Sequence, residues 1–309
     1  MYHHHPTQLS LFNLLAVLLL FCMATACTSD DAQDSRLANY YLGWRMIESM
    51  KDDRLPTAQA QYDSLRRSGF GNLGPVVVQS ALMLQLMTGD KAEALWVLKQ
   101  LPEDRAAALC ETGLFGTAPI CATLPKKAAV AHPEWRRRLR VHYLRDQGAR
   151  GNLKRNLASE LSVDTTNWRN WRNLDVDGDG RVLLREYIDQ HGFPTVAQIG
   201  ERGMHAVFFI IQHADQDPVW QAAQLPALTD AFKNGDISGE DLAYVTDRIR
   251  VNAGQRQLYG TQLMVDPEEG TVRLKPLADS LDLDRRRMEM HMMPIANYLR
   301  SVKSTASPH

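Results

Sequence analysis

The stretch HAVFFIIQHADQDP, residues 205–218, decides the fold class that the sequence predicts. Its apolar residues Val207, Ile210, Ile211 and Ala214 recur at spacings of three and four, which places them on one face of a buried α-helix. Most other apolar segments of the chain show the same helical spacing, and strand-like alternation is rare. The sequence therefore predicts a mainly α fold.

Towards the N-terminus, residues 36–144 read as short helices. Pro56 opens and Gly69 closes the first of them, LPTAQAQYDSLRRSG. Ala58 and Tyr62 recur as Ala92 and Trp96, an offset of 34 residues. That is the period of tetratricopeptide helix pairs, which this region resembles, although two copies are fewer than the ~3 that such stacks need. We expect a helical-hairpin region over 36–144 and a surface there for a protein partner.

Towards the C-terminus, residues 145–303 are expected to form a second helical domain. Ser238, with Asp241 three residues later, is typical of a helix start. Alternating apolar residues on either side of DPEEG, residues 266–270, predict a small β-hairpin. The Met-rich stretch 285–302 predicts two helices broken at Pro294, with the methionines in the core.

The N-terminus predicts export. LLAVLLLFCM, residues 14–23, is too short for a membrane span and is typical of a signal peptide over 1–26. The segment MATAC resembles the cleavage box of bacterial lipoproteins, in which the cysteine, here Cys27, is lipidated. Residues 27–35 would be a tether, and the protein would lie in the cell envelope, anchored by lipid in the periplasm or at the outer membrane. The alternative is an uncleaved signal anchor.

Two further cysteines, Cys110 and Cys121, frame a loop that contains two glycines and a proline. In an oxidising compartment such a pair is most simply a disulfide, and two free buried cysteines are the alternative.

The charge balance excludes nucleic acid as a partner. With 35 basic against 36 acidic residues, the formal net charge is −1, which gives no basic face for nucleic acid.

The run DVDGDGRVLLRE, residues 175–186, matches the calcium-loop pattern of EF-hands at every position. The pattern needs hard oxygens at alternate residues, which Asp175, Asp177 and Asp179 supply, a carbonyl at Arg181, and a closing bidentate Glu186. The alternative is an acidic turn whose aspartates cap helices. These loops usually work in pairs, and the similar stretch 234–245 lacks the closing glutamate, so we interpret it as a helix start. A single loop indicates weak Ca²⁺ binding that acts as a structural clasp.

Five short words of the C-terminal half, DQHGFPT, QHADQDP, LAYVTDRIRVNAG, QRQLYGTQ and MMPIANYL, resemble in that order an uncharacterised bacterial domain family. The resemblance covers about residues 145–301. It implies a compact, mainly helical domain and no established activity.

The polar residues of those words could meet in one pocket suited to acid–base chemistry or to a polar ligand. They have structural alternatives: Asp217 before Pro218 is a ready helix cap, and Asp247 could pair with Arg250. The leading hypothesis is a calcium-binding envelope protein with a binding or structural role. The second is an envelope enzyme. The pocket residues would be His213, Asp215, Asp247, Arg248, Tyr259 and Gln262.

Overall fold

The computed structural model describes residues 34–70, 73–101, 106, 122, 129–266 and 271–306. The chain forms two compact units, unit 1 over 1–101 and unit 2 over 102–309, and each is considered by itself. The boundary thus lies earlier than the expected one at 144, which falls inside a helix of unit 2. Cys27, Cys110 and Cys121, with the predicted signal peptide, lipidation and disulfide, lie outside the described residues.

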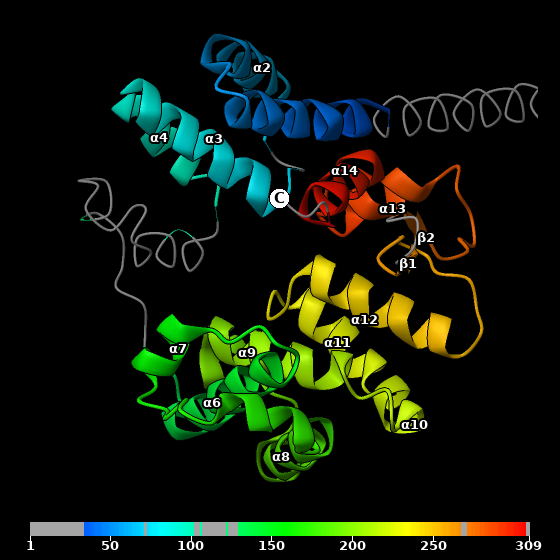
Figure 1. Cartoon of the computed structure of the whole chain (residues 1–309). Coiled ribbons are helices and arrows are strands. Elements are labelled where there is room, and N and C mark those ends of the chain that lie inside the picture. Colours follow the sequence, from blue (N-terminus) through cyan, green and yellow to red (C-terminus); the bar gives the residue numbers. More distant parts are fainter. Residues whose placement is uncertain are drawn as a thin grey trace, which may run out of the picture. The chain divides into compact units, whose positions relative to one another are not determined.

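Unit 1 is helical throughout its described part (Figure 1). A helix over 34–51 is followed by α2 (Leu55–Ser68), α3 (Pro75–Thr88) and α4 (Lys91–Leu98). Proline occupies the first turn of both α2 and α3, where its missing N–H costs nothing. Gly69 ends α2, as predicted, and Asp90 caps α4 by accepting from the backbone N–H of Glu93.

The aromatic residues that recur at the 34-residue offset meet in unit 1. The rings of Tyr62 and Trp96 both pack edge-on against Phe70, at 5.8 and 5.3 Å between centroids. The Tyr62 hydroxyl donates to Glu93 at 2.5 Å, and Arg66 reaches the same carboxylate at 2.6 Å. Helices α2 and α4 are therefore joined through the repeat positions. The likeness to tetratricopeptide pairs itself stays a prediction.

Unit 2 is built mainly of helices, with one two-stranded antiparallel sheet, so the predicted fold class is confirmed (Figure 1). In chain order its elements are α6 (Pro133–Ala149), α7 (Arg155–Glu160), the 3₁₀ helix η2 (Trp168–Asn173), α8 (Val176–His191), α9 (Val196–Gln212), α10 (Pro218–Ala223), α11 (Leu225–Lys233), α12 (Gly239–Asn252), β1 (Leu263–Asp266), β2 (Thr271–Leu274), α13 (Leu283–Glu289) and α14 (Ile295–Ala306).

Helix α9 is the centre of unit 2. Its N-terminus carries a reciprocal capping box between Thr195 and Gln198. The predicted stripe of Val207, Ile210 and Ile211 is buried, and helices α6, α8 and α12 pack around α9. Each of these neighbours covers part of the stripe with its own apolar face. The same packing brings polar side chains at the ends and flanks of α6, α8 and α9 close to one another.

The C-terminal part follows the sequence prediction. Strands β1 and β2 pair antiparallel, with Leu263 opposite Leu274. Ser238 caps α12 by accepting from the backbone N–H of Asp241. Helices α13 and α14 lie on either side of Pro294, and Met288, Met290 and Met292 are buried.

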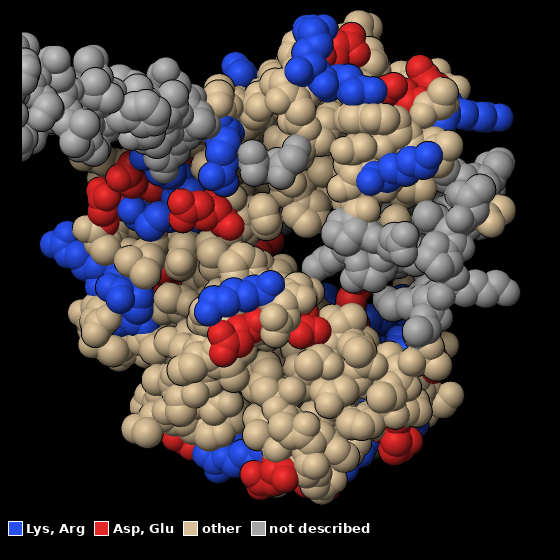
Figure 2. All heavy atoms as spheres, turned by 180° about the vertical axis from the view of Figure 1, so that it is seen from behind, with Lys and Arg blue, Asp and Glu red and all other residues tan. Residues whose placement is uncertain are grey.

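The surface carries both signs of charge. On the face shown in Figure 2, Lys and Arg are interspersed with Asp and Glu, as the near balance of charges predicts. Among the helices of the described ranges, none combines the length and the apolar character needed to cross a membrane.

Candidate functional site

The acidic run 175–186 is not a loop: it forms the first three turns of α8. Asp175 is the N-cap and accepts a hydrogen bond from the backbone N–H of Gly178 at 2.9 Å. Asp177 and Asp179 lie in the first turn, where the positive end of the helix dipole favours carboxylates. The expected loop conformation is therefore wrong for this structure, because the same aspartates start a helix.

The five predicted calcium ligands do not converge. Asp177 accepts from Arg150 at 2.7 Å, while Glu186 forms a two-bond ion pair with Arg138 at 3.2 and 2.7 Å. The Arg138 bond and charge hold the pKa of Glu186 below its ordinary value. As placed here, the residues do not form the sphere of six to eight oxygens that Ca²⁺ needs. Calcium binding by this segment stays a prediction.

A different cluster does converge. Asp146 on α6, Asp177 on α8 and His213, which follows α9, offer ligand atoms that all lie within 4.8 Å of one another. His213 Nδ1 is 2.8 Å from Asp146 Oδ1. Asp146 is 2% exposed, and the other two side chains are partly buried. Asp177 and His213 were both predicted site residues, but in two separate sites.

Positive charge holds the two carboxylates together. The Arg150 guanidinium donates to Asp146 Oδ1 at 2.6 Å and to Asp177 Oδ1 at 2.7 Å. Burial alone would raise the pKa of Asp146, but the hydrogen bond from His213 and the charges of His213 and Arg150 outweigh it. The pKa of Asp146 therefore lies below its ordinary value, and the carboxyl group is ionised at neutral pH.

A second histidine borders the cluster. His142 lies one turn before Asp146 on α6 and is 8% exposed. Burial lowers its pKa, although Asp146, Asp179 and Asp177 act in the opposite direction. A Cβ atom on Gly180 would lie 2.5 Å from His142 Nε2. Gly180 therefore leaves space for the imidazole ring of His142. Its backbone φ does not lie in the left-handed region, so the glycine is not required for a turn.

Of the predicted polar pocket, Asp215 and Arg248 do meet. Arg248 Nε lies 2.8 and 3.1 Å from the two Asp215 oxygens, and Arg248 Nη2 also contacts Oδ2. Asn252 donates to the same carboxylate at 2.8 Å. The pair joins the segment after α9 to α12.

Asp247 has another role. It is fully buried and accepts hydrogen bonds from the backbone N–H groups of Leu258, Tyr259 and Thr261, at 2.7 to 3.1 Å, and from the Thr261 hydroxyl at 3.0 Å. The alternative interpretation, a pair with Arg250, is wrong, since Arg250 Nε donates to the carbonyl of Arg256. Asp247 holds the turn that leads into the hairpin.

Tyr259 and Gln262 belong to the same turn. The carbonyl of Tyr259 accepts from the buried Arg287 at 2.6 Å, and the backbone N–H of Gln262 donates to Gln257 Oε1 at 2.8 Å. The six predicted pocket residues thus act in three different places: His213 with Asp146, Asp215 with Arg248, and the rest at the turn. Asp217 caps α10, as its alternative interpretation predicted.

Sequence reasoning missed Asp146, Arg150 and His142. A signal was available, because these residues are spaced by four along one helix and must share a face. What the sequence does not contain is the packing of α6 against α8 and α9, which brings that face to Asp177 and His213.

Comparison with known proteins matches the part of unit 2 in which α8 and the later elements lie. No curated protein and no solved structure matches the chain. The segment that does match a known family starts at residue 171, later than the expected 145. It includes the acidic run, but Asp146 lies outside it. Residues 171–307 match the model of a family described as "Family of unknown function (DUF6624)".

Proposed function

We propose that this chain is an exported, lipid-anchored envelope protein that binds a divalent metal ion through Asp146, Asp177 and His213. The observation that carries the proposal is the convergence of these three side chains, from three different segments, within 4.8 Å. Two ionised carboxylates this close repel each other unless a cation compensates them; in this structure Arg150 does so, and a metal ion with His213 as a further ligand could take its place. Here a metal ion would join α6, α8 and the end of α9.

The ligand types select the metal. One imidazole with two carboxylates suits Zn²⁺ or Mn²⁺ better than Ca²⁺, which prefers an all-oxygen sphere. Three protein ligands would leave at least one coordination position for water or a ligand. Asp177 keeps the metal-binding role that the sequence predicted for it, with different partners.

Arg150 is the internal competitor of the metal. Its guanidinium now neutralises Asp146 and Asp177, and 34% of its side-chain surface is exposed, so it can swing into solvent. A bound dication would replace it. Removal of the guanidinium in Arg150→Ala should therefore tighten metal binding by about tenfold or more, because the metal would no longer compete with charge-assisted bonds of about 1.5 kcal/mol or more each to Asp146 and Asp177.

The role of the metal would be a clasp. An ion that binds only the folded state stabilises it by about 2.7 kcal/mol at a free concentration of 100 times its Kd. Because its ligands come from three segments, the ion would oppose separation of α6 and α8 from α9. The other residues of the alternative enzyme hypothesis, Asp215, Asp247 and Arg248, are engaged in contacts within the fold, which favours a binding or structural role.

Calorimetric titration of the purified full-length chain with Mn²⁺, Zn²⁺ and Ca²⁺, together with thermal melts, tests the proposal. His213→Gln removes a ligand of the three-residue cluster only, and Glu186→Gln removes a ligand of the calcium loop only. We expect binding of one Mn²⁺ or Zn²⁺ that is lost in His213→Gln and kept in Glu186→Gln, with circular dichroism showing that both variants fold.

The opposite pattern would refute the proposal and favour the calcium loop: Ca²⁺ heat that disappears in Glu186→Gln and survives in His213→Gln. Absence of heat and of any shift in melting with all three ions would refute both. In that case Asp146, Asp177, Arg150 and His213 form an ion-pair network that needs no metal.

A further inference from the structure

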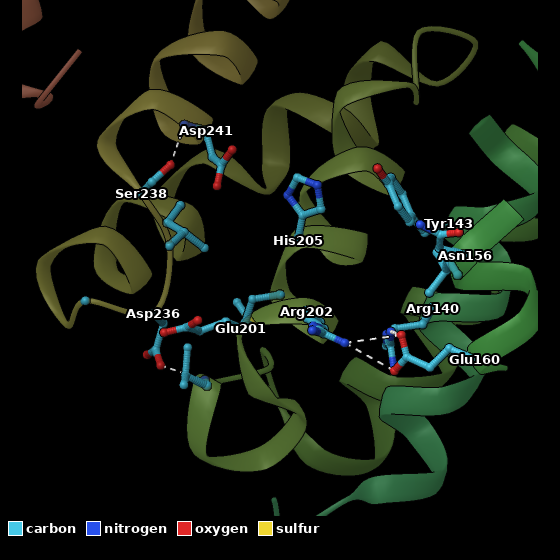
Figure 3. A pocket seen from close by; sticks show the side chains of 15 residues that line it. Arg140, Tyr143, Asn156, Glu160, Glu201, Arg202, His205, Asp236, Ser238 and Asp241 are labelled. Atoms are coloured by element: carbon cyan, nitrogen blue, oxygen red, sulfur yellow. Dashed lines mark hydrogen bonds and ion pairs between the residues drawn. The ribbon is translucent and has the colours of Figure 1, made fainter. Parts of the chain in front are cut away.

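Helix α6 contributes arginines to a cavity and to a separate cleft of unit 2, and the two differ in how those arginines are engaged. The cavity, of about 500 Å³, lies between α6, α7, α9 and the start of α12 (Figure 3). There Arg140 donates to both Glu160 oxygens at 2.8 and 2.7 Å, and Arg202 reaches the same two oxygens at 3.2 Å. Both guanidinium groups are thus directed at one internal carboxylate, with which an incoming anion would have to compete.

The cleft, of about 380 Å³, lies between α6 and α8. The two helices run antiparallel: Arg138, near the start of α6, pairs with Glu186 late in α8, whereas Arg150, just past the end of α6, reaches Asp177 in the first turn of α8. None of the three proposed metal ligands lines the cleft. A hollow of this size accommodates a small organic molecule.

Two of the three arginines that line the cleft have no carboxylate partner among the described residues. Arg138 is neutralised by Glu186, whereas Arg137 donates only to the backbone carbonyl of Leu161, at 3.1 Å. Arg145 is exposed, and its guanidinium group has neither a hydrogen bond nor an ion pair within the described part of the chain. The planar fork of a guanidinium group matches a carboxylate, so Arg145 is ready to bind one.

The remaining charges of the cleft also favour an anion. Once the Arg138 pair is cancelled, the two positive charges of Arg137 and Arg145 face the single negative charge of Asp179, which leaves a formal charge of +1. Asp179 lies in the first turn of α8, where the helix dipole favours a carboxylate. Burial chiefly lowers the pKa of His142, so the imidazole ring that lines the cleft is neutral at neutral pH.

Beside these charges the cleft has an exposed apolar wall. Leu174 is 51% exposed and Val182 is 64% exposed, although both are large hydrophobic side chains. Val141 lies midway between Arg137 and Arg145 on the same face of α6. From Arg145 to Arg137 the helix rises by about 12 Å, comparable to the extended alkyl chain of decanoate. Exposed apolar surface beside an unpaired cation is typical of a site for a ligand that carries both an anionic group and an apolar chain.

We infer that this cleft binds a single-chain carboxylate of the fatty-acid type, with the carboxylate on Arg145 and the alkyl chain along Val141 and Val182. The carboxylate would form charge-assisted hydrogen bonds with the guanidinium group, and the chain would remove the exposed valine from water. The positive charge selects against a cation, and the apolar wall selects against a small inorganic anion.

Calorimetric titration of the full chain with decanoate tests the inference, in the presence of a chelator that keeps metal ions from binding the carboxylate. We expect a dissociation constant below about 1 mM. Hexanoate, whose shorter chain buries less apolar surface, and decyltrimethylammonium, which carries the opposite charge, should both bind at least about tenfold more weakly.

Arg145→Gln should weaken decanoate binding about tenfold, the range of a charge-assisted hydrogen bond. The matched control is Arg155→Gln, an exposed arginine of α7 outside the cleft, which should leave binding unchanged. Val182→Gln removes an apolar contact of the alkyl chain without a change of charge and should weaken binding about threefold or more. All three side chains are exposed, so circular dichroism should show an intact fold in each variant.

No binding of decanoate at millimolar concentration, equal affinity for decyltrimethylammonium, or equal weakening by Arg145→Gln and Arg155→Gln would overturn the inference. Unchanged affinity in Val182→Gln would place the alkyl chain elsewhere and overturn it as well. Sedimentation with phosphatidylglycerol vesicles that Arg145→Gln abolishes, without any binding of decanoate, would assign the residues of the cleft to a membrane surface instead.

Discussion

Asp247→Asn should be among the most damaging single substitutions in unit 2, although it changes only one oxygen to an NH₂ group. The carboxylate is fully buried and accepts from four donors: three backbone N–H groups, of Leu258, Tyr259 and Thr261, and the Thr261 hydroxyl. An asparagine in the same position has one oxygen left to accept. Its NH₂ group would face N–H donors that have no other acceptor in the turn.

The magnitude follows from the number of donors lost. A hydrogen bond to a charged group contributes about 1.5–3 kcal/mol, and one amide oxygen can serve two of the four donors. Two lost bonds correspond to about 3 kcal/mol or more. That is a large part of the 5–15 kcal/mol by which a domain is typically stable.

Urea unfolding followed by far-ultraviolet circular dichroism measures this loss directly. The midpoint should fall strongly while the slope m stays unchanged, since the surface exposed on unfolding is the same. The matched control is Asp230→Asn, whose ion pair with Lys233 is exposed, with an expected change within about 0.5 kcal/mol. A loss below about 1 kcal/mol for Asp247→Asn would refute the assignment of Asp247 to the turn and revive its role in a polar pocket.

Two further predictions concern helix contacts. Gly180→Ala should destabilise unit 2 by about 1–2 kcal/mol despite the better helix propensity of alanine, because the new Cβ would meet His142 Nε2 at 2.5 Å; a rise in melting temperature would contradict this. Glu160→Gln should flatten the acid limb of the stability curve. The hydrogen bond from Arg140 holds the pKa of Glu160 below its ordinary value, so its contribution is present above about pH 4.3, the unfolded value, and is lost as the pH falls below it. Parallel melting curves of wild type and variant against pH would contradict that reasoning.

The elements of this fold with local causes could be predicted from the sequence. The stripe of α9, the Pro56 and Gly69 ends of α2 and the hairpin at β1 and β2 each depend on residues a few positions apart. The boundary between the units could not be predicted in this way. Helix α6 is rich in arginine, with five in its 17 residues, but composition does not show which unit a helix packs on; its packing against α9 assigns it to unit 2.

The candidate site depended on tertiary contacts. Asp146, Asp177 and His213 are separated by 31 and 36 residues, as their numbering shows, and no pattern in the sequence pairs them. Polar words such as QHADQDP indicated that His213, Asp215 and Asp217 have roles. They did not show that these three residues contact three different partners: His213 contacts Asp146, Asp215 contacts Arg248, and Asp217 contacts Arg185.

The acidic run shows why a complete motif match can still describe the wrong conformation. Four positions of the calcium pattern have another role in this structure: Asp175 caps the helix, Asp177 pairs with Arg150, Gly180 leaves space for His142, and Glu186 pairs with Arg138. Aspartate at an N-cap and carboxylates in the first turn are favoured by the same alternation that a calcium loop requires. Val182 discriminates between the two conformations, since the loop needs this apolar residue for packing, whereas here it is 64% exposed. Replacing it with a polar residue such as glutamine should leave the melting temperature nearly unchanged if α8 begins at Val176, and should lower it if the run folds as a packed calcium loop.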